Sequence, residues 1–155
     1  MNASPLIFLA RAGLLDLLQL VSPEVVIPRP VADEIKRRGS SDPTAIAISG
    51  STWLRVVDPH TVPPEIMSWD LGRGEAAVLA WCVAHRGAEA IIDDLSGRRC
   101  AAVFGIPVRG TLGLVMLAKK RGRFKAARPV LEMMRRAGMY LSDQVLERAL
   151  KSVGE

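Results

Sequence analysis

The 155-residue sequence has only two cysteines, Cys82 and Cys100, and only two histidines, His60 and His85. Two cysteines cannot build a disulfide framework, and their apolar helical surroundings are typical of buried thiols in a reducing cytosol. The isolated histidines form no zinc-binding pattern. No apolar run approaches the roughly 20 residues of a membrane span, and no basic segment precedes the apolar N-terminal stretch. We therefore expect a cytoplasmic protein that makes no membrane contact.

Acidic residues are absent from Leu95 to Leu131, while the net charge of the whole chain is +5. The basic residues of this interval are Arg98, Arg99, Arg109, Lys119, Lys120, Arg121, Arg123, Lys125 and Arg128. Such a segment favours contact with a phosphate backbone. The alternative is a solvated surface that the acidic first part of the chain balances in space.

Short β-branched runs alternate with helical patterns along the chain. Strands are predicted at Glu24–Pro28, Trp53–Val57 and Ala90–Ile92, with the end of a fourth at Pro107-Val108. Helices are predicted at Pro5–Ala12, Leu14–Leu20, Pro30–Arg38, Asp42–Ser49, Gly74–Arg86, Ser96–Phe104, Leu112–Arg121, Ala126–Ala137 and Asp143–Ser152, with an irregular loop at Asp58–Arg73. The alternation predicts one α/β domain over residues 1–155, a three-layer α/β/α sandwich with a central parallel sheet.

Carboxylates follow several of the predicted strands. Asp93 and Asp94 end the third strand in the stretch AIIDDL, Glu34 lies beside the apolar face of the helix after the first strand, and Glu75 opens an almost wholly apolar helix. In open parallel sheets, functional groups gather beyond the carboxyl ends of the strands. Each acid also has a simpler interpretation: a solvated turn, a solvated helical residue, or a glutamate that stabilises a helix N-terminus.

Carboxylates that converge on one point cannot all ionise without a cation, and a hard divalent ion with oxygen ligands satisfies them. Mg²⁺ or Mn²⁺ held in this way activates water against a phosphodiester. Together with the basic segment, this pattern favours a nuclease. The chain has no P-loop and no GxGxxG after a strand, and its serines lack the partners of a catalytic triad. A receiver domain is excluded because it needs a further acid after the paired aspartates, and no acid lies between Asp94 and Glu132.

Five segments in order resemble the PIN-domain superfamily: NASPLIFLARAG, VIPRPVADEI, GRGEAAVLA, AIIDDLSGRRCA and GIPVRGTLGLVMLAKKRG. The match is closest to the bacterial and archaeal branch of DUF3368 type and covers nearly the whole chain. The resemblance implies a PIN-like sandwich and an Mg²⁺- or Mn²⁺-dependent ribonuclease. It also implies that such proteins are often toxins neutralised by a small antitoxin protein, and often homodimers.

The resemblance also implies roles for single residues. The catalytic and metal-binding acids would be Glu34, Glu75 and Asp94 or Asp93, with Asp94 preferred, and the family's first acid falls on Asn2, which keeps an oxygen ligand but loses the charge. A family hydroxyl falls on Ser4, and Arg98, Arg99, Arg109 and Lys119 are candidates for contacts with the RNA backbone. Because the chain begins at Met1, almost no residues precede Asn2 to form the first strand, and we expect neighbouring strands to expose ladder groups.

These observations predict a metal-dependent ribonuclease, the toxin-like component of a toxin–antitoxin system. The alternative is a catalytically degenerate PIN-like module that binds nucleic acid or a protein partner. A homodimer is expected because Leu112–Ala118 is apolar nearly all round, unless this helix is simply central in the fold.

Overall fold

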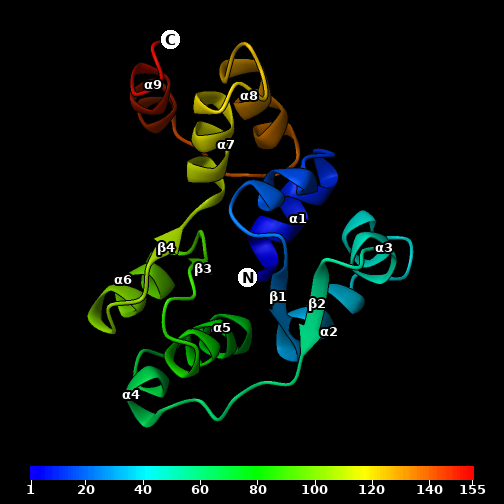
Figure 1. Ribbon diagram of the computed structural model, residues 1–155, viewed down its shortest axis with the longest axis vertical. Helices are drawn as coiled ribbons and strands as arrows, with labels where there is room; N and C mark the ends of the chain where they lie inside the picture. The colour runs from blue at the N-terminus through cyan, green and yellow to red at the C-terminus, as the bar shows by residue number, and fades with distance from the viewer.

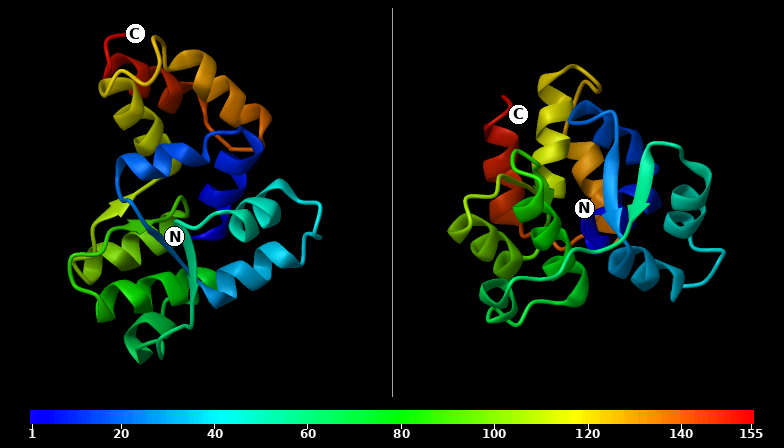
Figure 2. Two further views of the ribbon diagram at one scale, coloured as in Figure 1. Left: turned by 45° about the vertical axis from the view of Figure 1, so that its right-hand side comes forward. Right: turned by 60° about the horizontal axis from the view of Figure 1, so that its bottom comes forward.

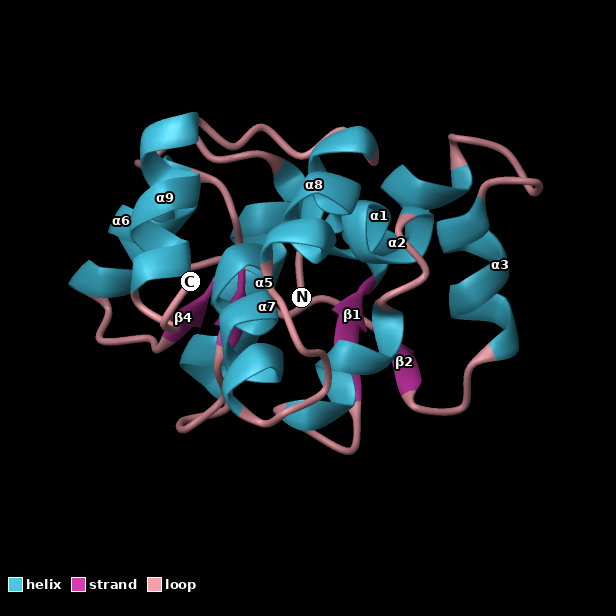
Figure 3. Ribbon diagram, turned by 90° about the horizontal axis from the view of Figure 1, so that it is seen from above, coloured by secondary structure: helices cyan, strands magenta, loops and turns pink.

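The computed structural model describes residues 1–155 and contains two pairs of parallel strands. Strand β1 (Val25–Pro28) pairs with β2 (Leu54–Val57). Strand β3 (Ala90–Ile91) pairs with β4 (Val108–Arg109). Seen from above, β4, β1 and β2 lie in one row with helices on both sides of it (Figure 3). The predicted α/β/α architecture with parallel strands is confirmed.

The helices alternate with these strands as the sequence patterns predict. Their bounds are α1 (Ala3–Arg11), the 3₁₀ helix η1 (Leu15–Leu20), α2 (Arg29–Lys36), α3 (Pro43–Gly50), α4 (Pro64–Met67), α5 (Arg73–Ala84), α6 (Leu95–Val103), α7 (Thr111–Lys120), α8 (Arg128–Arg136) and α9 (Asp143–Lys151). The segment expected to be an irregular loop contains the short helix α4. The stretch predicted as helix at 14–20 is a 3₁₀ helix, held in place by Leu17 and Leu18, which are 2% and 0% exposed.

The start of the chain lies between the two strand pairs (Figure 1). The amino group of Met1 donates a hydrogen bond to the carbonyl of Val26 at 2.8 Å. The backbone N–H of Asn2 donates to the carbonyl of Ile91 at 3.0 Å. Helix α1 begins at the next residue. The described strands form two separate two-stranded sheets, and Met1 and Asn2 bridge them through these two hydrogen bonds.

Helix α5 connects the two strand pairs, because it contacts both β1 and β3. Its buried residues include Val78 and Leu79, which belong to a hydrophobic cluster of 33 buried residues. Helices α7, α8 and α9 gather at the end of the molecule where the C-terminus lies (Figure 2). The core thus holds the strands in register while the beginning of α5 reaches the carboxyl ends of β1 and β3.

Helix α7 was the basis for expecting a homodimer. Its residues Leu114, Val115 and Ala118 are fully buried in the core, and none of its large apolar side chains is exposed. The apolar character of α7 is therefore explained by its central position, and it provides no argument for an interface. The homodimer stays a prediction without support from this helix.

Candidate active site

Asn2 is a buried polar residue at the carboxyl ends of β1 and β3, where it is only 3% exposed. Its Nδ2 donates a hydrogen bond to Oε1 of Glu75 at 2.7 Å. Two features fix the position of Asn2. Its backbone N–H is hydrogen-bonded to Ile91, and helix α1 begins at the next residue. No protein group donates a hydrogen bond to Oδ1 of Asn2. This amide oxygen therefore keeps its lone pairs for a ligand.

Gly74, the second residue of α5, is the point where three chain segments meet. A methyl group on its Cα would lie 3.1 Å from Oδ1 of Asn2, 3.3 Å from Cγ2 of Val31 and 3.4 Å from Oε2 of Glu34. The amide of Asn2 and the carboxylate of Glu34 therefore both lie against the start of α5. A methyl group here would make these side chains shift by a few tenths of an ångström, so glycine favours the close approach of both oxygens to α5.

Asp94 and Asp93 have different partners. Oδ2 of Asp94 accepts a hydrogen bond from the backbone N–H of Gly97 at 2.8 Å and caps α6. A methyl group at Gly97 would lie 3.5 Å from Cγ of Glu75 and 3.7 Å from Oδ2 of Asp94, so these two acids lie close to one glycine. The carboxylate of Asp93 instead accepts two bonds from Thr111, from the backbone N–H at 2.7 Å and from Oγ1 at 2.6 Å. Asp94 thus keeps one oxygen for a ligand, whereas both oxygens of Asp93 hold the start of α7.

We call the group formed by Asn2, Glu34, Glu75 and Asp94 the carboxyl-edge site. A pocket of about 560 Å³ opens beside it and is lined without a single hydrophobic side chain. Its charged lining residues are Asp33, Glu34 and Glu75, with Arg29, Arg37 and Arg73. Arg29 is paired with Asp58 at 2.8 Å, but Arg37 and Arg73 form no ion pair. Two cations without carboxylate partners therefore face the pocket beside the acids, an arrangement suited to an anionic ligand.

The basic residues that the sequence suggested for RNA contact lie outside this pocket. Two are held by ion pairs, Arg109 with Glu89 at 2.9 Å and Lys119 with Glu155 at 3.4 Å. Arg98 and Arg99 are exposed on α6, which Asp94 caps, so they lie nearer to the carboxyl-edge site.

Ser4 is exposed in the first turn of α1, two residues after Asn2. It forms no side-chain hydrogen bond, unlike the hydroxyl of Thr111, which binds Asp93.

Arg37 and Arg73 were missed by the sequence analysis. Arg73 stands two residues before Glu75 in the segment GRGE, and Arg37 follows Glu34 by three residues. In a helix, residues three apart are neighbours on the surface, so the spacing could have linked Arg37 to Glu34. The segment from Leu95 to Leu131 shows its basic character by composition alone, whereas the link between Arg37 and Glu34 depends on their positions around a helix.

The donor atoms fit a hard divalent cation. Mg²⁺ commonly takes one or two protein carboxylates and keeps several waters. Glu34 and Glu75, with the amide oxygen of Asn2, provide such a set around Gly74. No group of three or more His, Cys, Asp or Glu side chains is close enough to form a complete metal site from those residue types. The residues therefore fit an ion that keeps part of its water shell, and they do not fit a closed protein cage.

Fold and site together define a parallel α/β protein with an acidic, arginine-flanked site at the carboxyl ends of its strands. The profile of the family DUF3368, described as a PIN domain, matches residues 1–155. The chain therefore belongs to the PIN-domain family. PIN domains in general are nuclease-type proteins that depend on divalent metals and bind RNA. Comparisons with curated proteins and with solved structures find no significant match. None of the helices could serve as a membrane span.

Proposed function

We propose that this protein is a metal-dependent endoribonuclease whose active site is the carboxyl-edge site. The observation that carries the proposal is the hydrogen bond from Nδ2 of Asn2 to Oε1 of Glu75 at 2.7 Å, beside Glu34 and a pocket lined mainly by charged residues. The bond leaves Oδ1 of Asn2 free. It thereby presents an accessible amide oxygen of a buried residue beside two carboxylates, which is the donor set that Mg²⁺ or Mn²⁺ prefers.

Each residue of the site has a distinct role in this proposal. Asn2 orients Glu75 and contributes Oδ1, while Glu34 and Asp94 supply further carboxylate oxygens from α2 and from the cap of α6. Arg73 and Arg37 bind the phosphate, because a guanidinium donates paired hydrogen bonds to phosphate oxygens. When bound, the divalent ion supplies an activated water and neutralises charge on the phosphodiester.

The test is cleavage of single-stranded RNA with Mn²⁺, with EDTA as the metal-free control, by the wild type and Glu75→Gln. The glutamine side chain would still accept the hydrogen bond from Asn2, so the variant removes charge while keeping the local structure. We expect a loss of activity of about 10²–10⁴-fold with an unchanged melting temperature. Glu132→Gln is the matched control, because Glu132 is exposed on α8 and forms no ion pair.

Full cleavage in EDTA, or full activity of Glu75→Gln, would refute the proposed site. Binding of RNA without cleavage under any metal condition would instead favour the catalytically degenerate module. The further assignment as the toxin component of a toxin–antitoxin pair follows from the family resemblance, and growth arrest on expression, relieved by a neighbouring small protein, is its test.

A further inference from the structure

Another pocket adjoins the polar pocket of the carboxyl-edge site. We call it the α4 pocket, because helix α4 and the loops on either side of it form much of its lining. It has a volume of about 370 Å³, and six of its eleven lining residues are hydrophobic. The two pockets share Pro30, Pro59 and Arg73, and α4 lies beside α5 (Figure 1). A ligand held by Arg73 in the polar pocket can therefore extend into the α4 pocket.

The apolar lining of the α4 pocket suits the flat ring of a nucleobase. Val62 and Leu71 supply aliphatic surface, and Met67 is 66% exposed although its side chain is large and apolar. The ring of His60 also lines the pocket, and its centroid lies 5.0 Å from the ring of Trp81. Thioethers pack well against aromatic rings, and bases stack on ring side chains without regard to sequence. These walls therefore favour a base without selecting which one.

Two opposite charges line the α4 pocket without neutralising each other. The carboxylate of Asp70 and the guanidinium of Arg73 both belong to its lining. Neither takes part in an ion pair, with the other or with any residue of the chain. Both residues are exposed, so a ligand can reach them. The pocket therefore suits a ligand that carries an anion at one end and hydrogen-bond donors at the other.

Among the RNA bases, guanine has the donors that Asp70 requires. An ionised aspartate accepts hydrogen bonds and donates none. The Watson–Crick edge of guanine presents two adjacent donors, N1–H and the N2 amino group, which one carboxylate can accept together. Adenine and cytosine present one donor beside a ring nitrogen acceptor, and uracil presents one donor between two carbonyls. A carboxylate oxygen repels those acceptors, so the other three bases cannot form the paired bond.

We propose that the α4 pocket binds a guanine base of the RNA substrate. The carboxylate of Asp70 accepts from N1–H and N2–H of the base, and the guanidinium of Arg73 binds the phosphate of the same nucleotide. This inference rests on the proposed ribonuclease function, because it assigns a base preference to that site. The ring lies against Met67 and His60, and the paired bond to Asp70 selects guanine.

The probes are the four nucleoside 5′-monophosphates GMP, AMP, CMP and UMP, titrated into the full chain by calorimetry without added metal. We expect GMP to bind at least tenfold more tightly than each of the other three, as for other paired contacts to a base edge. Guanosine should bind more weakly than GMP, because Arg73 then lacks its phosphate partner. Equal affinities for the four nucleotides, or no detectable binding of GMP at millimolar concentration, would overturn the proposal.

Asp70→Asn should change which base is preferred. Asp70 has a φ of +50°, a conformation that asparagine also tolerates, so we expect the variant to fold. An amide presents one acceptor and one donor, which complement the amino group and N1 of adenine. GMP affinity should fall at least tenfold while AMP affinity rises, whereas a purely structural role of Asp70 would lower both. A preference for GMP that survives the substitution would overturn the proposal.

Glu65→Gln is the matched control. Glu65 is exposed on the same helix, forms no ion pair and does not line the pocket, so the variant removes one negative charge nearby and should keep the preference for GMP. Loss of the preference in this variant would mean that net charge selects the nucleotide, which would refute the role of Asp70.

Cleavage of RNA oligonucleotides with and without guanine distinguishes this inference from the proposed function. Cleavage of both at equal rates, with equal nucleotide affinities, would overturn guanine recognition and leave the ribonuclease in place. Selective GMP binding that Asp70→Asn reverses, without cleavage of any RNA, would support guanine recognition and refute the ribonuclease.

Discussion

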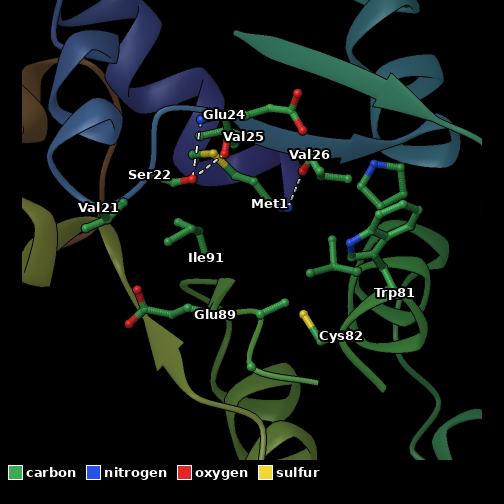
Figure 4. Close-up of a pocket in the computed structure, with 14 residues that line it drawn as sticks. Met1, Val21, Ser22, Glu24, Val25, Val26, Trp81, Cys82, Glu89 and Ile91 are labelled. Carbon is green, nitrogen blue, oxygen red and sulfur yellow. Dashed lines mark hydrogen bonds between the residues drawn. The ribbon is translucent and has the colours of Figure 1, made fainter. Parts of the chain in front are cut away.

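Two cavities border the strands β1 and β3, and they are chemically opposite although the residues beside them, Met1 and Asn2, are adjacent in the chain. The carboxyl-edge site presents charged side chains around Gly74 and a pocket without hydrophobic lining. A second cavity, of about 280 Å³, is lined mostly by hydrophobic residues, among them Met1, Val26 and Ile91 (Figure 4). The side chain of Asn2 therefore borders one region, and Met1 borders the other.

The amino group of Met1 gives the largest expected effect. Burial lowers the pKa of this group from 8.0 to about 5, with a smaller opposing effect of Cys82. Between pH 5 and 8 the unfolded chain therefore binds more protons than the folded chain, so the free energy of unfolding should rise with pH, by up to about 1.4 kcal/mol per pH unit. It should level off above pH 8, where the amine is neutral in both states, and below pH 5, where it is protonated in both.

Urea unfolding from pH 4.5 to 8.5 measures this slope. The Nα-acetylated protein is the control, because it keeps an N–H for Val26 and retains every other titrating group, including Glu24 and Glu89, which line the same cavity as Met1. The amino group accounts for any difference between the two slopes. Equal slopes would mean that the amine is solvated in the folded protein.

Gly74→Ala should damage the carboxyl-edge site alone. The added methyl group would press on Asn2 and Glu34, and we expect Mn²⁺ affinity to fall about 10–100-fold, as for other groups that position metal ligands. Gly113→Ala in α7 is the matched control, because its methyl group would meet only Cγ of Arg109 at 3.4 Å. That variant should gain about 0.5–1 kcal/mol of stability and keep its metal affinity. Equal metal affinities in the two variants would mean that Gly74 does not position the metal ligands.

Asn2→Asp tests how a negative charge at residue 2 changes the stability and the metal affinity of the carboxyl-edge site. The new carboxylate would face Oε1 of Glu75 where a hydrogen bond now runs over 2.7 Å, so the metal-free protein should melt at a lower temperature. A divalent ion would relieve the repulsion, and we expect metal affinity to rise about tenfold, since ligand charge strengthens binding of hard cations. Melting curves with and without Mn²⁺ measure both effects, and a variant that melts higher without metal would contradict the geometry.

Arg73→Ala should have the smallest effect, on RNA binding alone. The loss of one phosphate contact should weaken binding to single-stranded RNA a few-fold and lower the salt slope by about 0.7. Arg136→Ala on α8, an exposed arginine without an ion pair, should leave the slope unchanged. Filter binding over a range of salt concentrations compares them. A larger change in the salt slope for Arg99→Ala than for Arg73→Ala would indicate that RNA binds along α6 and not in the pocket.

The sequence indicated the places of the acids in the fold more directly than the ion pairs of the basic residues. Glu34, Glu75 and Asp94 were expected near one edge because parallel strands place their carboxyl ends there, a rule that needs only strand positions, and their role in a site stays a prediction. Arg109 and Lys119 could not be judged in this way, since their partners Glu89 and Glu155 are 20 and 36 residues away in the chain. Ion pairs between distant segments depend on packing, which no local pattern encodes.

The two aspartates of AIIDDL show the same limit on a smaller scale. Their position after a strand was predictable, but their division of labour was not, because it depends on Thr111 of α7 for one and on Gly97 of α6 for the other. Although they are adjacent in the chain, Asp93 uses both carboxylate oxygens to bind Thr111, and Asp94 keeps one oxygen without a hydrogen bond.

The alternation of strands and helices and the parallel order of the strands follow from the amino-acid sequence. Local hydrophobic period and turn residues suffice for these features, because they act over a few residues. Two further features follow from tertiary packing alone: Met1 and Asn2 bridge β1 and β3 through backbone hydrogen bonds, and the side chain of Asn2 binds Glu75. Those outcomes depend on the distance between β1 and β3, which is set by α5 packing against both, and so by contacts between residues far apart in the chain.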